Sequence, residues 1–296
     1  MKRALIILNP CAGTKHANKY FVEIIDVFCQ AGWDVVVKTT AASGDGTVIA
    51  MERAGEFDLV VCIGGDGTFN EVIDGVAKSG TSVPVGYIAA GSTNDFAGSL
   101  GLSRDVVQAA RDIVNGQVRT LDAGSFNGRH FSYVASFGAF TRTSYEAPQS
   151  IKNALGHLAY ILEGIRDIPS IRPERLYLKM ENGVYGGDYI FGAICNSTSL
   201  GGILTLSDDL VDMNDGKFEV LLIKSPSNIL ELNQILIALT TQNFDCPLIS
   251  FFSSSRLEIT ADPQMPWTLD GEYQEGAEHI VVENEHSAIR LVTSGK

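Results

Sequence analysis

The sequence predicts an α/β protein with two domains. A Rossmann-like α/β domain is expected over residues 1–124, and a mostly antiparallel β-sandwich domain over residues 125–296. In the first part, short apolar runs alternate with segments of helical periodicity, which is typical of a parallel sheet with crossover helices. After residue 122, strand-like runs follow one another with few helices between them. The last of these runs is a candidate to return to the sheet of the first domain.

The strands of the first domain are expected at short, nearly uninterrupted apolar runs, as in a sheet that is buried on both faces. These runs are Ala4–Leu8, Val35–Lys38, Leu59–Ile63 and Val85–Ala89. Apolar residues at helical spacing predict helices between the strands, and Gly32 is expected to end the first helix. The helical segments are Phe21–Phe28, Asn70–Ala77 and Val106–Val114.

The second domain is expected to contain mainly strands. They are Phe131–Ala135, Leu176–Met180, Tyr189–Ile194, Phe218–Ile223, Leu257–Thr260, His279–Val282 and Ile289–Thr293. Asn182-Gly183 lies between two of these runs and predicts a hairpin. Helices are expected at about 150–166 and 229–240.

Composition and charge exclude several classes of protein. With 296 residues, 45% of them hydrophobic and 19% charged, the chain is typical of globular proteins. It carries 22 Lys and Arg against 35 Asp and Glu, and a formal net charge of −13 repels the phosphates of nucleic acids. We therefore expect no nucleic-acid partner. No run approaches 18 uninterrupted apolar residues, so no membrane span is predicted and a cytoplasmic location is expected.

The most informative segment is the glycine-rich loop Gly64-Gly65-Asp66-Gly67-Thr68-Phe69-Asn70-Glu71, which directly follows a predicted strand. Glycines let backbone N–H groups approach phosphate oxygens, and the start of the next helix adds a partial positive charge. The loop matches neither the GxGxxG pattern nor a Walker loop. Phosphates repel a carboxylate, so Asp66 is expected to hold Mg²⁺, to bind a hydroxyl or to help accept a proton. The alternative is a glycine turn with a capped helix.

Two further loops offer small residues, hydroxyls and free N–H groups after a strand. Asn9-Pro10-Cys11-Ala12-Gly13 follows the first strand, Gly91-Ser92-Thr93-Asn94-Asp95 follows the fourth, and Thr40 ends the second. Each loop alone is more simply a turn with a helix cap. Because the carboxyl ends of parallel strands meet at one edge of a sheet, the loops together predict a nucleotide-binding cleft.

Two acidic segments in the second half of the chain carry carboxylates that could bind a cation or act as a general base. The segment Asp208–Lys217 carries carboxylates suited to a hard cation, and its alternative is a solvated acidic loop. In Asp270-Gly271-Glu272, a continuing strand would turn both carboxylates to the same side. A pair of acids suits general-base work on an alcohol, and the alternative is a surface turn.

Together these motifs resemble the diacylglycerol kinase catalytic-domain family, which includes soluble bacterial lipid kinases and sphingosine kinases and is distantly related to NAD kinases. The resemblance runs nearly from end to end, in the family's order and spacing. The matching segments are Asn9-Pro10…Gly13, Thr40…Gly44-Asp45, Gly64–Val72, Gly91…Asn94-Asp95-Phe96, Leu121–Gly124 and Asp270–Glu272. Three segments resemble the soluble bacterial diacylglycerol kinases in particular: Ser144–Pro148, positions 152–164 and Asp215–Phe218.

The resemblance implies a two-domain kinase that binds ATP in its cleft and uses Mg²⁺. It implies nucleotide contacts from Asn9, Pro10, Cys11, Ala12, Gly13, Thr40, Gly64, Gly65, Asp66, Gly67, Thr68, Phe69, Asn70 and Ser92. Glu272 would be the general base that takes the proton of the lipid hydroxyl. The acids that would position Mg²⁺ and the phosphates are Asp66, Asp95 and Asp270.

A structural Mg²⁺ is also implied, in the loop before the strand at Phe218–Ile223. The side chain of Asp215 would be one ligand, beside the backbone carbonyls of Asp212 and Lys217. Asp122 would link this metal site to the cleft.

The activity implied is ATP- and Mg²⁺-dependent phosphorylation of a membrane lipid, with diacylglycerol converted to phosphatidic acid. The lipid substrate would be met transiently at the membrane surface by a peripheral enzyme, and a homodimer is left open. The alternatives are an NAD kinase, which shares the glycine-rich loop, and a nucleotide-binding regulatory protein without catalysis.

Overall fold

The computed structural model describes residues 1–13, 16–92, 94–138, 172–181, 183–200 and 204–294. The chain forms two compact units. Unit 1 contains Met1–Ala123 and His286–Lys296, and unit 2 contains Gly124–Glu285. The predicted helix at 150–166, Thr93 and the motif positions between 144 and 164 lie outside the described residues.

Unit 1 is built on a parallel sheet with the strand order β2-β1-β3-β4-β17. Its strands are β1 (Lys2–Leu8), β2 (Trp33–Thr39), β3 (Leu59–Gly64), β4 (Val85–Ala89) and the C-terminal end of β17 (His279–Thr293). The predicted strands of the first domain are confirmed, and β1, β3 and β4 are almost wholly buried. The order reverses at β1, which has β2 on one side and β3 on the other, and ligands of such sheets bind beyond the strand ends at that point.

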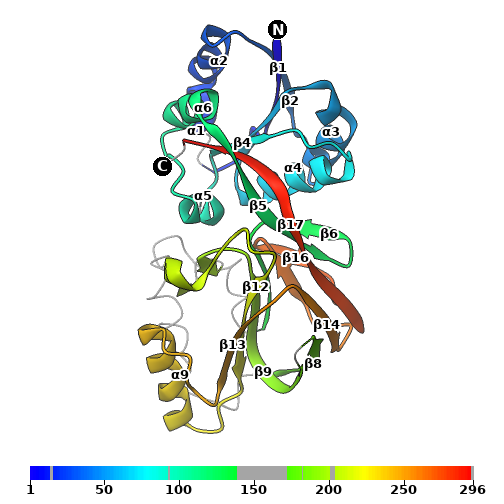
Figure 1. Ribbon diagram of the computed structural model, residues 1–296, viewed down its shortest axis with the longest axis vertical. Coiled ribbons are helices and arrows are strands. Elements are labelled where there is room, and N and C mark those ends of the chain that lie inside the picture. Colours follow the sequence, from blue (N-terminus) through cyan, green and yellow to red (C-terminus); the bar gives the residue numbers. More distant parts are fainter. Residues whose placement is uncertain (14–15, 93, 139–171, 182, 201–203, 295–296) are drawn as a thin grey trace. The chain divides into compact units, whose positions relative to one another are not determined.

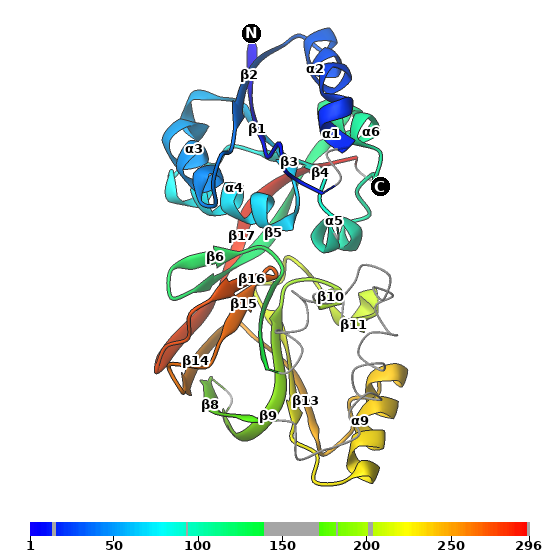
Figure 2. The same cartoon turned by 180° about the vertical axis from the view of Figure 1, so that it is seen from behind.

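Helices cover both faces of this sheet (Figures 1 and 2): α2 and α6 lie on one side, α3 and α4 on the other. The helices are α1 (His16–Lys19), α2 (Phe21–Gln30), α3 (Asp45–Arg53), the 3₁₀ turn η1 (Ala54–Glu56), α4 (Asp66–Lys78), α5 (Asp95–Ser99) and α6 (Val106–Asn115). Alternate residues of β1, namely Ala4, Ile6 and Leu8, pack in one cluster with the buried faces of α2 and α6.

The helix boundaries partly differ from the prediction. Gly32 ends α2 as expected, with a φ of +80° and its N–H donated to the carbonyl of Cys29. The fourth helix, α4, begins at Asp66, earlier than the predicted Asn70, so that Asp66 lies in its first turn. Helix α3 was not predicted, because Gly44 and Gly46 give its start the composition of a loop.

Unit 2 is a β-structure whose described strand pairs are antiparallel. Its strands are β5 (Gln117–Phe126), β6 (Arg129–Phe131), β7 (Val134–Gly138), β8 (Glu174–Met180), β9 (Gly183–Cys195), β10 (Ser199–Leu200), β11 (Leu204–Thr205), β12 (Phe218–Lys224), β13 (Ile249–Ser254), β14 (Arg256–Ala261), β15 (Trp267–Leu269), β16 (Glu272–Gln274) and β17, and its helical segments are η4 (Asp208–Leu210) and α9 (Ile229–Thr241). Strands β5 and β17 continue into unit 1. The antiparallel character, the β8–β9 hairpin and the helix after β12 are confirmed.

Two strand predictions for this part of the chain were wrong. The run Phe131–Ala135 is two strands, β6 and β7, because the backbone N–H groups of Ser132 and Tyr133 donate to the carboxylate of Asp270. The separate runs His279–Val282 and Ile289–Thr293 are one strand, β17, whose polar middle hid its continuity.

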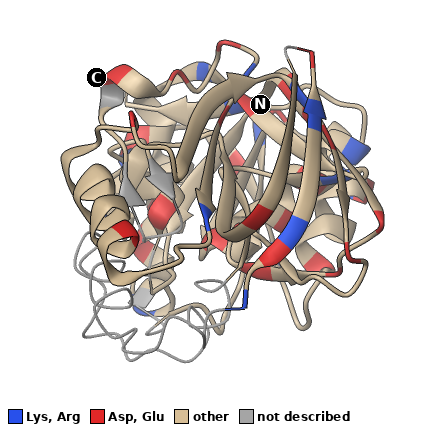
Figure 3. Ribbon diagram, turned by 90° about the horizontal axis from the view of Figure 1, so that it is seen from below, with Lys and Arg blue, Asp and Glu red and all other residues tan. Residues whose placement is uncertain are grey.

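Among the described residues of unit 2, a cluster of buried side chains includes Trp267, whose ring is tilted against those of Phe126 and Phe137. The outward charged side chains of β8, β9 and β14 pair with one another, as in Arg175–Asp188 and Lys179–Glu258. Figure 3 accordingly shows acidic and basic residues side by side on these strands. No helix within the described part of the chain is long and apolar enough to cross a membrane.

Candidate functional site

The loops after β1, β3 and β4 meet at the carboxyl edge of the unit 1 sheet. The backbone N–H of Asn9 donates to the carbonyl of Ile63 (2.9 Å), and that of Ala90 donates to the carbonyl of Gly64 (2.7 Å). The side-chain amide of Asn9 also donates to Thr68 Oγ1 at 3.0 Å, which ties the first loop to the start of α4. The structure therefore brings these loops together at one edge of the sheet, as the order of the strands predicted.

Glycines are needed where these loops touch. A Cβ on Gly91 would lie 2.6 Å from the Cα of Gly65, and one on Gly13 would lie 2.4 Å from the carbonyl oxygen of Ala90. Real Cβ atoms do not approach so closely, and Gly13 also has a φ of +50°. Backbone therefore packs directly on backbone where these loops meet.

The other candidate nucleotide residues surround this contact to different degrees. Pro10, Cys11 and Ala12 form a turn in which Asn9 accepts the N–H of Cys11 at 2.9 Å. Cys11, Gly13 and Ser92 are exposed, and the N–H of Thr40 donates to the carbonyl of Leu8 at the same edge.

Two residues of the glycine-rich segment, Phe69 and Asn70, are buried on α4, and the ring of Phe69 stacks on that of Tyr87.

Asp66 is largely buried at the centre of this group. Its Oδ2 accepts the backbone N–H of Asp95 at 2.9 Å, and its Oδ1 accepts the hydroxyl of Tyr87 at 3.2 Å. Burial, and secondly the negative charge of Asp95, raise the pKa of Asp66 to about 6. Tyr87 was not predicted as a site residue, although a lone tyrosine in an otherwise apolar strand was a signal for it.

The raised pKa of Asp66 predicts a specific dependence of stability on pH. The folded state favours the protonated form, so the stability contributed by Asp66 is complete below pH 3.8 and is lost as the pH rises through about 6. We expect the free energy of unfolding of the wild type to fall, relative to Asp66→Asn, by about 2–3 kcal/mol between pH 4 and pH 8. Urea unfolding without nucleotide or metal measures this difference, and a pH-independent difference would contradict it.

In unit 2, Asp270 and Gly271 form the tight turn between β15 and β16. Both residues have a positive φ (+51° and +83°), and Leu269 pairs with Glu272 across the turn. This is the hairpin turn that Asp-Gly favours. The strand therefore does not continue through Asp270, and the prediction that Asp270 and Glu272 share one face of a strand was wrong.

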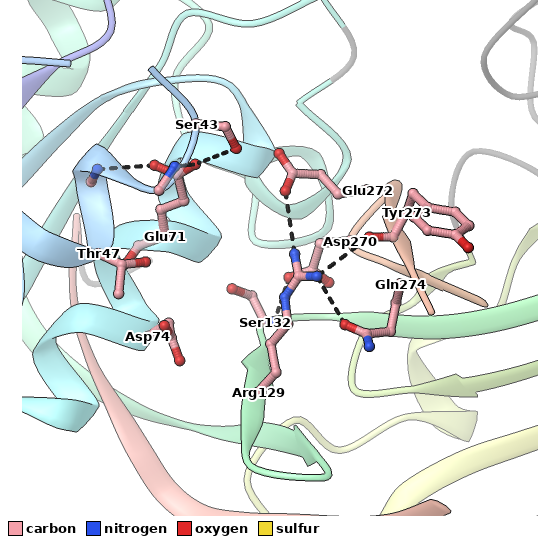
Figure 4. Close-up of polar contacts among 12 residues, drawn as sticks. Ser43, Thr47, Glu71, Asp74, Arg129, Ser132, Asp270, Glu272, Tyr273 and Gln274 are labelled. Atoms are coloured by element: carbon pink, nitrogen blue, oxygen red, sulfur yellow. Dashed lines mark hydrogen bonds and ion pairs between the residues drawn. The ribbon is translucent and has the colours of Figure 1, made fainter. Parts of the chain in front are cut away.

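The carboxylate of Asp270 is buried, with 4% of the residue exposed. Its oxygens accept the backbone N–H groups of Ser132 (2.6 Å), Tyr133 (3.0 Å) and Val134 (3.0 Å), and its own N–H donates to the carbonyl of Val134. Figure 4 shows Asp270 beside Ser132. This arrangement fixes the turn that carries Glu272.

Glu272 stands at the start of β16, and 40% of its side chain is exposed. Its Oε2 lies 3.4 Å from Nη2 of Arg129, and Nη1 of the same guanidinium donates to Gln274 Oε1 at 2.9 Å (Figure 4). Arg129, which sequence analysis did not single out, thus holds the side chain of Glu272 without burying it. A carboxylate held in this way can reach a substrate from solvent.

The acidic loop before β12 is held by hydrogen bonds of its own side chains. Asp212 Oδ1 accepts the N–H of Asn214 and Asp215 Oδ1 accepts the N–H of Lys217, so the loop is ordered by its own carboxylates. Behind it, Glu219 is buried, and its Oε2 has no hydrogen-bond partner among the described residues. Burial, then Asp215 and Asp212, raise the pKa of Glu219 to about 7.

These donors are hard oxygen atoms, the kind that Mg²⁺ prefers, and the buried oxygen of Glu219 would gain from a nearby cation. Within the described residues no group of three or more His, Cys, Asp or Glu side chains is arranged around a metal position. A cation here would therefore depend on backbone carbonyls and water for much of its coordination.

Asp122 is wholly buried in unit 1, on β5. Its Oδ1 lies 2.9 Å from His286 Nδ1 and accepts the N–H of Ser287 at 2.8 Å. Within unit 1, Asp122 therefore ties β5 to β17.

The chain is similar to known proteins over most of its length. A family model described as "Diacylglycerol kinase catalytic domain" matches residues 3–126. The diacylglycerol kinase of Bacillus subtilis is 35% identical over 276 residues, covering 92% of this chain and 90% of the relative. The diacylglycerol kinase of Staphylococcus epidermidis is 30% identical, covering 92% of this chain and 86% of the relative.

The fold is also that of solved structures. A crystal structure of a diacylglycerol kinase from Bacillus anthracis matches with a TM-score of 0.73 at 20% identity, covering 99% of this chain and 97% of that one. A second crystal structure from the same organism matches with a TM-score of 0.79, at the same identity and coverage. The predicted fold class is thereby confirmed.

Proposed function

The chain belongs to the diacylglycerol kinase catalytic-domain family and is a kinase, and from this we propose that it transfers the γ-phosphate of ATP to the hydroxyl of diacylglycerol. The product would be phosphatidic acid. The observation that carries the proposal is the meeting of the loops after β1, β3 and β4 at the sheet edge, with Gly65 against Gly91. Backbone N–H groups and the start of α4 suit the phosphates of a nucleotide.

The reaction assigns distinct tasks to the residues. The lipid hydroxyl oxygen forms a bond to the γ-phosphorus, the bond from that phosphorus to the β–γ bridging oxygen breaks, and ADP leaves. The carboxylate of Glu272 takes the hydroxyl proton. Asp270 positions Glu272 through the turn, and Arg129 keeps its carboxylate in place.

Mg²⁺, when bound, would neutralise the charge that develops on the transferred phosphoryl group. In unit 1, Asp66 and Asp95 are the carboxylates placed among the nucleotide loops. In unit 2, we propose that Asp215, with the carbonyls of Asp212 and Lys217, holds a structural Mg²⁺. Because diacylglycerol resides in the bilayer, the enzyme would meet its substrate transiently at the membrane surface.

The structural metal site gives a test by thermal unfolding. Without nucleotide, we expect Mg²⁺ to raise the Tm of the wild type, because saturation to 100 times the Kd contributes about 2.7 kcal/mol. The Tm of Asp215→Ala should not respond to Mg²⁺, because the variant lacks the side-chain ligand. Asp209→Ala removes an exposed carboxylate of the neighbouring η4 turn and serves as the control. It should keep the full response to Mg²⁺, and an equal response of Asp215→Ala would exclude Asp215 as a ligand.

The class of acceptor is tested with γ-labelled ATP and Mg²⁺. One reaction contains a total lipid extract in mixed micelles, and a parallel reaction contains NAD. The proposal predicts label in the organic phase, in a product that comigrates with phosphatidic acid. Label in NADP alone would identify an NAD kinase, and label in neither acceptor from a protein that binds ATP would favour a regulatory protein.

A further inference from the structure

We propose that Glu71 is a positioning residue for the nucleotide, because it fixes the loop from Thr40 to Gly44 at the N-terminus of α3. The inference rests on the proposed function, since it concerns the ATP-binding edge of unit 1. Glu71 lies on α4, in the turn that follows Asp66 and Gly67. It belongs to the glycine-rich motif, but sequence analysis gave it no role.

The side chain of Glu71 reaches the start of a different helix (Figure 4). Its Oε1 accepts the backbone N–H of Gly44 at 2.7 Å, and its Oε2 accepts that of Gly46 at 3.0 Å. The hydroxyl of Ser43 donates to Oε1 at 3.4 Å, and the hydroxyl of Thr47 donates to the backbone carbonyl of Glu71 at 3.0 Å. Both carboxylate oxygens are thus used on the first turn of α3 and the loop before it.

Helix α3 needs such a partner because its own N-cap residue is Gly44, which has no side chain. A carboxylate at this position satisfies free N–H groups and interacts favourably with the helix dipole. The packing is shaped for it: a Cβ on Gly46 would lie 2.7 Å from Glu71 Oε2 and 2.9 Å from Glu71 Cβ. Gly46 therefore leaves the space that the Glu71 side chain occupies.

A second carboxylate completes the loop. Asp45 Oδ2 accepts the N–H groups of Ala41 (2.7 Å) and Ala42 (2.9 Å), and these bonds hold the pKa of Asp45 below its usual value. The N–H of Thr40 is bonded to the carbonyl of Leu8. The N–H groups of Thr40, Ala41, Ala42, Gly44 and Gly46 are thus already engaged within unit 1.

The start of α3 is therefore not expected to bind the phosphates of the nucleotide. A free helix N-terminus is an anion site, but that of α3 already holds the carboxylate of Glu71. The start of α4 differs from that of α3, because no side chain caps it at Gly65, and it is therefore the helix start suited to a phosphate. The segment from Thr40 to Gly44 serves instead as a fixed wall beside the nucleotide, and Glu71 keeps it fixed.

Loss of this support should act on nucleotide affinity and leave the chemical step intact. In Glu71→Gln, an amide NH₂ replaces one acceptor and faces a backbone N–H, so at least one bond to α3 is lost. We expect the KM for ATP and the Kd of ATP, measured by calorimetry, to rise about tenfold or more, which corresponds to the loss of one charge-assisted hydrogen bond. The kcat and the KM for diacylglycerol should stay within about twofold of the wild type.

Two matched variants separate positioning from a loss of folding. Gly46→Ala leaves the charge of Glu71 in place but fills its space, and should reproduce the rise in KM and Kd. Glu52→Gln removes an exposed carboxylate from the same helix α3 and should change neither. A variant that was merely less stable would lose maximal rate in proportion to the unfolded fraction and would keep its KM.

Unchanged KM and Kd for ATP in both Glu71→Gln and Gly46→Ala would overturn the inference, as would a fall in kcat at constant KM. If the wild type transferred no phosphate to any lipid, the proposed function would fail. The inference about Glu71 would then still be decided by the Kd of ATP in the same variants.

Discussion

Replacing Glu272 by alanine is expected to lower the rate of phosphate transfer by about 10²–10⁴-fold, the usual contribution of a general base. The Kd of ATP should remain near that of the wild type, because Glu272 contacts Arg129 in unit 2, whereas the loops proposed to bind the nucleotide belong to unit 1. The measurement is the initial rate of phosphatidic acid formation at saturating ATP and lipid, together with ATP binding by calorimetry.

The control for this variant is Glu275→Gln, which removes an exposed carboxylate three residues further along the chain. It should retain the wild-type rate. Glu272→Gln keeps the size of the side chain and should be as slow as Glu272→Ala, because an amide does not accept the proton. If either Glu272 variant keeps most of the activity, Glu272 is not the base.

The second large effect concerns stability. Asp270→Ala should lower the free energy of unfolding by about 3 kcal/mol or more, because the buried N–H groups of Ser132, Tyr133 and Val134 lose their acceptor. Alanine also tolerates the φ of +51° at this position less well than aspartate. Urea unfolding monitored by the fluorescence of Trp267, which lies in the same hairpin, measures the change.

Asp262→Ala provides the matched control, since exposed Asp262 accepts one backbone N–H, that of Gln264, at 2.8 Å. Its cost should stay below about 1 kcal/mol. Asp270→Asn keeps one acceptor oxygen and should fall between the two. A cost for Asp270→Ala no larger than that for Asp262→Ala would show that Asp270 does not hold the turn.

The sequence was sufficient where the structure depends on local patterns. The runs Ala4–Leu8, Leu59–Ile63 and Val85–Ala89 are apolar because the strands are buried on both faces, and each was located within one or two residues. Parallel strands bring their carboxyl ends to one edge, so the order of the loops along the chain was enough to predict that Asn9, Gly65 and Gly91 would lie together.

What the sequence could not provide are contacts between distant residues. Glu71 caps a helix that begins 26 residues earlier, and nothing in either segment marks the partner. Asp270 interrupts the run Phe131–Ala135 from more than 130 residues away by taking its N–H groups. The polar middle of β17 breaks the apolar pattern, and only pairing with other strands defines it as one strand.

The most direct test of the proposed reaction is its stoichiometry with one defined acceptor. Purified protein, Mg²⁺ and ATP are incubated with diacylglycerol in mixed micelles, and ADP and phosphatidic acid are quantified over time. The proposed reaction predicts one phosphatidic acid for each ADP, with formation of both reduced by the same factor in Glu272→Ala. ADP formed without phosphatidic acid, or no ADP from a protein that binds ATP, would contradict it.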